Sequence, residues 1–89
     1  MTTATTTTVT VRYFAAARAA AGVETEPVQL PDGATVEAVL AAVRERHGAE
    51  LSRVLDRCSF LLDEIAVRDR SVVLPAGAAL DVLPPFAGG

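Results

Sequence analysis

The 89-residue sequence contains no lysine, since all eight of its basic residues are arginine. The chain therefore has no side-chain amine that could form a Schiff base or accept an activated carboxyl group of its own. It has a single cysteine, Cys58, so no internal disulfide can form and a structural zinc site is not expected. We expect Cys58 to be an inert, partly buried thiol.

A basic surface and long apolar segments are also missing. Eleven acidic residues against eight basic ones give a formal charge of -3, which argues against a nucleic-acid partner. The N-terminal stretch MTTATTTTVTVRYF lacks a basic start followed by a long apolar run. We therefore expect neither a signal peptide nor a membrane span, and the expected location is the cytoplasm.

The residues that are present suit one small folded domain. Hydrophobic residues make up 51% of the chain, which is enough for a modest core and too much for a disordered chain. No linker or internal repeat divides the sequence. We expect a flexible polar leader at residues 1–7, a folded domain at residues 8–83 and an extended C-terminal tail at residues 84–89.

The hydrophobic spacing alternates between the strand period of two and the helix period near 3.6. The main helix is expected to start after the N-cap Thr35, to bury Val36, Val39, Leu40 and Val43, and to stop at Gly48. The other expected elements, in order, are a strand at 8–14, a short helical turn at 15–22, a strand at 24–30, a short helix at 50–57, and strands at 59–67, 72–74 and 79–83, with Leu62 and Ile65 contributing to the core.

This order predicts an α+β fold of the β-grasp (ubiquitin-like) type, in which one main helix packs across a mixed sheet of about five strands. The first two strands should form an antiparallel pair at one edge of the sheet. In that arrangement the first and last strands commonly pair in parallel at the centre. The chain after residue 83 then leaves from the middle of the sheet.

The sequence ends in LPPFAGG, which has the features of a stiff, slender segment that could insert into a partner. Pro84 and Pro85 lack backbone N–H groups and hold the chain extended. Phe86 can anchor in a pocket of a partner, and residues 87–89 are slender enough for a narrow channel. Fully extended, the chain from Pro84 to Gly89 spans at most roughly 20 Å. Its reactive group is the carboxylate of Gly89, which becomes an acyl donor only after activation.

Two stretches resemble the ubiquitin-like sulfur-carrier family and, within it, the small subunits of molybdopterin synthase. VRYFAAARAAAG, residues 11–22, resembles the family's opening strand and turn. LPPFAGG resembles its ending of two prolines, two variable residues and a diglycine. Two alanines follow Gly77, where family members often have an acidic pair. This departure leaves open which activating enzyme and which acceptor this chain serves.

The resemblance implies a carrier with no bound cofactor. An ATP-dependent activating enzyme would adenylate Gly89, which would then be converted to a thiocarboxylate. The sulfur would pass to cyclic pyranopterin monophosphate inside the large subunit of molybdopterin synthase, in a heterotetramer of two small and two large subunits. The positions that match the family's tail and partner contact are Gly89, Gly88, Ala87, Phe86, Pro85, Pro84, Leu83 and Phe14.

Other polar residues are better explained by structure than by catalysis. We expect Arg18 to cap a helix or pair with a surface acid, and His47 to favour a helix C-terminus. Asp63 and Glu64, as neighbours on one strand, would face opposite ways and make a poor acid–base pair. The alternatives that stay open are a sulfur carrier for thiamine, cysteine or tRNA thiolation, and a β-grasp binding module whose diglycine is incidental.

Overall fold

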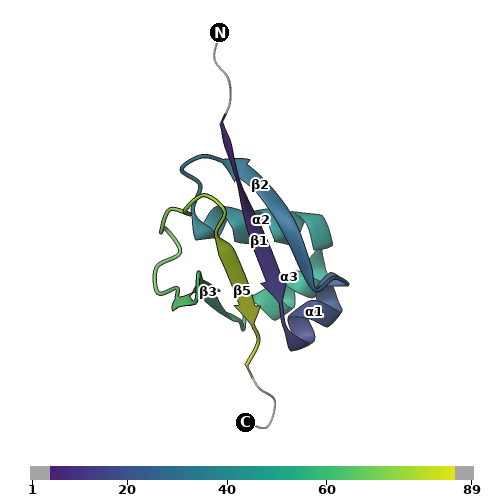
Figure 1. Ribbon diagram of the computed structural model, residues 1–89. Coiled ribbons are helices and arrows are strands. Elements are labelled where there is room, and N and C mark those ends of the chain that lie inside the picture. Colours follow the sequence, from purple (N-terminus) through teal and green to yellow (C-terminus); the bar gives the residue numbers. More distant parts are fainter. Residues whose placement is uncertain (1–4, 86–89) are drawn as a thin grey trace.

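The computed structural model describes residues 5–85, which form a five-stranded mixed sheet with helices packed against one face (Figure 1). The strand order across the sheet is β2-β1-β5-β3-β4. This arrangement confirms the predicted β-grasp fold. The elements are β1 (Thr6–Tyr13), α1 (Ala15–Ala21), β2 (Thr25–Pro31), α2 (Val36–His47), α3 (Ala49–Leu55), β3 (Ser59–Leu62), β4 (Ile65–Ala66) and β5 (Ala79–Leu83).

Strands β1 and β2 form the predicted antiparallel pair at one edge of the sheet. The pairing begins at Thr6 opposite Pro31, so β1 starts inside the expected leader, two residues before the expected start of the strand at residue 8. Thr7 is 6% exposed and pairs with Leu30, which places it in the folded domain. The threonines that suggested a polar leader also favour a strand, because their β-branched side chains fit a pleated sheet.

Helix α2 begins and ends where its sequence signals predicted. The hydroxyl of Thr35 accepts a hydrogen bond from the N–H of Ala38 (3.3 Å), and Gly48 follows the last residue with a positive φ of 84°. Val36, Val39, Leu40 and Val43 are fully buried, because the 3.6-residue period places them on one side of the helix. The apolar side of α2 therefore covers one face of the sheet.

The prediction of one continuous strand at residues 59–67 is wrong, because the chain reverses direction within this range. Strands β3 and β4 are an antiparallel pair joined at Asp63 and Glu64, whose φ angles are 47° and 71°. Two consecutive residues with positive φ are typical of a tight hairpin turn that matches the twist of its strands. Ile65 is 72% exposed, so it is not the core residue that was predicted, whereas Leu62 does pack against the core.

The expected strand at residues 72–74 is also absent. This segment makes one isolated bridge, between Val73 and Thr35. Leu74 is nevertheless buried, and its N–H donates to the carbonyl oxygen of Ala34 (2.9 Å). The segment is a connection held by a few contacts, because a short apolar run can fill the core without joining a ladder.

The core lies between the sheet and helices α1, α2 and α3. Residues facing this side of the sheet are buried and alternate with residues that face outward. Burying a valine or leucine of this kind stabilises the fold by about 1.5–3 kcal/mol. The strand residues of the core are Val9, Val11, Tyr13, Val28, Leu30, Phe60, Leu80 and Val82.

Strands β1 and β5 run parallel and side by side, with Thr10 opposite Ala79 and Tyr13 opposite Val82. Both point toward the end of the sheet where α1 lies (Figure 1). Since β3 pairs with the other edge of β5, the last strand has a neighbour on each side. The chain after Leu83 therefore leaves from the interior of the sheet and not from an edge.

Candidate functional site

The described part of the tail leaves the sheet as a short stem. Leu83 and Pro84 are half-buried, and Pro85 is exposed. Neither proline can donate a backbone hydrogen bond, so the ladder of β5 cannot continue along them. The other predicted tail residues, Phe86, Ala87, Gly88 and Gly89, lie outside the described residues.

Phe14 lies beside this stem. Its backbone is extended, and its N–H donates to the carbonyl oxygen of Val82 (3.2 Å). Continuing the register of β1 and β5 by one residue places Phe14 next to Leu83, on the face of the sheet without helices. The Phe14 side chain is large and apolar, yet the residue is 41% exposed. An exposed aromatic of this kind is suited to a partner's pocket, and its role stays a prediction.

A groove of about 640 Å³ opens next to the two prolines. Its apolar lining comes from α1, α3 and the stem, and three charged residues of the α3 region also line it. The stem therefore has a concave surface on one side and the exposed Phe14 near its base. The lining residues are Ala16, Val54, Pro84, Pro85, Arg53, Asp56 and Arg57.

The sequence interpretation missed an ion pair beside Phe14. Arg12 and Asp81 are direct partners in the β1–β5 register, and the guanidinium donates to both oxygens of the carboxylate. Asp81 raises the pKa of Arg12, first through these hydrogen bonds and then through its charge. The alternation of β1 places Arg12 and Phe14 on the same face, which is the signal that could have identified Arg12.

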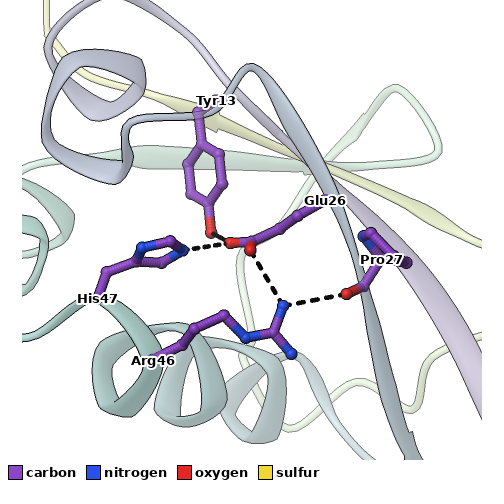
Figure 2. A network of polar contacts seen from close by, with 5 residues as sticks. All are labelled: Tyr13, Glu26, Pro27, Arg46 and His47. Atoms are coloured by element: carbon purple, nitrogen blue, oxygen red, sulfur yellow. Dashed lines mark hydrogen bonds and ion pairs between the residues drawn. The ribbon is translucent and has the colours of Figure 1, made fainter.

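Glu26 is the centre of a second polar cluster, on the helix side of the sheet (Figure 2). One carboxylate oxygen lies 2.5 Å from the hydroxyl of Tyr13 and 2.6 Å from Nε2 of His47, and the other accepts from Arg46 at 3.0 Å. Burial raises the pKa of Glu26, but the hydrogen bonds from these three side chains outweigh it, so its pKa lies below the ordinary value. Burial and Glu26 also raise the pKa of Tyr13.

This cluster gives His47 a structural role. His47 lies at the C-terminus of α2, as predicted, and its ring contacts both Glu26 and the edge of Tyr13. Arg46 also donates to the carbonyl oxygen of Pro27 (3.1 Å), which ties α2 to β2. The cluster therefore ties β1, β2 and α2 together at the edge of the core.

The remaining polar candidates have structural explanations as well. Arg18 lies 3.9 Å from Glu24, a surface pair of the predicted kind. Asp63 accepts a hydrogen bond from the N–H of Ala79 (2.9 Å), so it is a turn residue and not one of two opposed strand carboxylates. Cys58 is half-buried, as predicted, and burial raises the pKa of its thiol, which disfavours the reactive thiolate.

Within residues 5–85, no three histidine, cysteine, aspartate or glutamate side chains come together in a way that could hold a metal ion. None of the helices formed by these residues has the length and hydropathy needed to cross a bilayer.

The fold and the Pro84–Pro85 stem, which leaves from the interior of the sheet, define a small β-grasp protein. The ThiS family matches residues 11–89, and the chain belongs to this family. The match includes both stretches that indicated a ubiquitin-like sulfur carrier, and it confirms that resemblance.

Relatives of known description agree with this assignment. A protein of Chlamydomonas reinhardtii described as a molybdopterin synthase sulfur carrier subunit is 38% identical over 89% of this chain and 95% of its own length. A putative molybdopterin converting factor subunit 1 from Pyrococcus furiosus is 27% identical, with a TM-score of 0.81 over 90% of this chain and 99% of that one.

Other solved structures have the same fold. SAMP1, a small archaeal modifier protein of Haloferax volcanii, is 29% identical, with a TM-score of 0.82 over 92% of this chain and 99% of that one. A chain from a complex of subunits 1 and 2 of the molybdopterin-converting factor of Helicobacter pylori is 23% identical. Its TM-score is 0.70 over 92% of this chain and 99% of that one, a likeness of fold.

Proposed function

We propose that this protein is the sulfur-carrier subunit of a molybdopterin synthase, with Gly89 as the residue that carries the sulfur. The observation that supports this most directly is the position of β5. It runs through the interior of the sheet and ends in the Pro84–Pro85 stem, next to an exposed aromatic. A rigid body from whose sheet interior the chain leaves in this way suits a terminus that works inside another protein.

The chemistry follows from the carboxylate of Gly89, which is a poor acyl donor until it is activated. In the first step a carboxylate oxygen attacks the α-phosphate of ATP on an activating enzyme, forming an acyl-adenylate and releasing pyrophosphate. Sulfide then attacks the carbonyl carbon of the acyl-adenylate, AMP leaves as the C–O bond breaks, and loss of the S–H proton gives the thiocarboxylate. Gly88 and Gly89 carry no side-chain atoms beyond Cα, so the tip can enter a narrow channel.

The acceptor in this proposal is cyclic pyranopterin monophosphate, bound in the large subunit of the synthase. Two successive transfers, each from one thiocarboxylate, supply the two sulfur atoms of the dithiolene. The assembly contains two small and two large subunits. The descriptions of the relatives from Chlamydomonas reinhardtii and Pyrococcus furiosus support this assignment, as does the match to the ThiS family through residue 89.

Co-purification with the large subunit tests the assignment. The tagged large subunit from the same genome should retain this protein in a complex of two plus two chains, measured by light scattering. A carrier for thiamine, cysteine or tRNA thiolation shares the tail chemistry but should not be retained. Failure to form the complex, with both proteins folded, would overturn the assignment to molybdopterin synthase.

A further inference from the structure

The groove beside the Pro84–Pro85 stem carries an excess of positive charge. Arg53 and Arg57 both line it, and among residues 5–85 neither of them forms an ion pair. Asp56, the acidic residue of the described lining, has a carboxylate oxygen 3.1 Å from Nη2 of Arg44, which offsets its charge. The groove therefore offers two guanidinium groups to a negatively charged ligand.

Helix α3 and the turn after it bring both arginines to the groove. Arg53 lies in the last turn of α3. The N–H of Arg57 donates to the carbonyl oxygen of Val54 (3.0 Å), so the backbone continues as a tight turn and Arg57 lines the same groove. Val54 itself packs partly against the core and contributes to the apolar lining together with Ala16 of α1. This combination suits a ligand that has both an apolar group and a carboxylate.

The stem forms one wall of the groove, so the chain reaches residue 86 at its rim. Four residues follow the stem: Phe86, Ala87, Gly88 and Gly89. Fully extended they reach at most roughly 14 Å, whereas a groove of about 640 Å³ is on the order of 10 Å across. The segment is therefore long enough to bring the Gly89 carboxylate to the arginines.

We propose that residues 86–89 dock into this groove of their own domain until a partner captures them, with the Phe86 ring on the apolar lining and the Gly89 carboxylate on Arg53 and Arg57. The inference rests on the proposed function, since it gives a resting position to the segment that carries the sulfur. Charge complementarity selects the carboxylate, because a guanidinium group matches its two oxygens. Tethering selects this chain's own segment, because a short tether gives an effective concentration of about millimolar.

Docking of this segment regulates access to the chain terminus. A partner enzyme binds only the fraction of molecules whose segment is released, so its apparent affinity falls in proportion to that fraction. A thiocarboxylate carries the same single negative charge as a carboxylate. The groove therefore holds the segment both before and after sulfur is loaded.

Backbone NMR relaxation of the full-length protein tests the inference. In wild type the amide order parameters of Ala87 and Gly88 should lie above about 0.6, and Arg53→Gln combined with Arg57→Gln should bring them below that value. High salt should act in the same direction, because it screens exposed charges. The matched control is Arg68→Gln, which removes an exposed arginine outside the groove and should leave the order parameters as in wild type.

A second variant tests the apolar half of the contact. Phe86→Ser should also release the segment, and it changes no residue of the described domain. Both variants should be folded by circular dichroism, since Arg53 and Arg57 are exposed. Order parameters below about 0.6 in wild type, or values unchanged in the folded arginine variant, would overturn the inference. The proposed function would then still stand, because this experiment involves neither the large subunit nor the activating enzyme. The co-purification experiment decides the proposed function separately.

Discussion

Two buried carboxylates on opposite faces of the sheet show how this small protein uses polar groups. Glu26, on the helix side, is surrounded by Tyr13, Arg46 and His47 (Figure 2). Asp81, on the open side, is paired within residues 5–85 with Arg12, whose side chain is 41% exposed. The first carboxylate is held by three side chains, of which Arg46 is well exposed and the other two are largely shielded, whereas the second is held by one surface guanidinium.

The difference indicates that the helix side of the sheet mainly stabilises the fold, whereas the open side is the one available for binding. The helix side combines an apolar core with a polar cluster that ties β1, β2 and α2 together. The open side has few charges, an exposed aromatic and the base of the tail. Substitutions on the helix side should therefore affect the stability of the fold, whereas substitutions on the open side should affect binding.

The largest expected effect on stability comes from the core beneath α2. Leu40→Ala removes a fully buried side chain and should lower the free energy of unfolding by about 2–5 kcal/mol, because a cavity is added to the lost burial. Urea unfolding at pH 7 measures the change. A loss of less than about 1 kcal/mol would mean that the helix side is not the stabilising face.

A smaller effect is expected at the polar cluster. Glu26→Gln should cost about 1–3 kcal/mol at pH 7, since hydrogen bonds to a charged acceptor are lost or weakened. Because the folded-state pKa of Glu26 lies below its ordinary 4.5, its contribution is complete above that pH and is lost as the pH falls through the folded pKa. The difference in stability between wild type and variant should therefore shrink in acid.

The control for this experiment is Glu24→Gln, which changes an exposed carboxylate two residues away. It should alter stability by at most about 0.5 kcal/mol at any pH. The role given to the cluster would be contradicted if both substitutions changed the free energy of unfolding equally. It would also be contradicted if the stability difference between wild type and Glu26→Gln were the same at pH 7 and pH 3.

The smallest effect on stability is expected on the open face. Phe14→Ser should change the free energy of unfolding by less than about 1 kcal/mol, because the residue is 41% exposed. The same substitution should weaken binding to the large subunit about ten-fold or more, as expected for an aromatic that fills a partner's pocket. Paired unfolding and calorimetry experiments measure both quantities. A large loss of stability with unchanged binding would reverse the division between the two faces.

The sequence was sufficient to predict most of the fold. The capping signals at Thr35 and Gly48 define α2, and β5 has the predicted bounds, Ala79–Leu83. The error at residues 59–67 has a physical reason. Asp63 and Glu64 adopt left-handed φ values that neither residue type signals as strongly as Asn-Gly does, so the turn was not visible in the apolar run.

Less of the candidate site could be predicted from the sequence. The tail motif and Phe14 could be identified from residue type and position alone. The pairing of Arg12 with Asp81 depends on the register between the first and last strands, which are 69 residues apart at this point. A shift of one residue would place Asp81 on the other face. The cluster around Glu26 likewise requires three elements to meet, which no local pattern specifies.

The most direct test of the central claim is the intact mass of the protein after incubation with ATP, a sulfur donor and its activating enzyme. The account predicts a mass gain equal to the exchange of one oxygen for one sulfur atom, located by fragmentation at Gly89, and no gain in a folded variant lacking Gly89. An unchanged wild-type mass with an active enzyme, or the same gain without Gly89, would contradict the claim that this chain carries sulfur on its last residue.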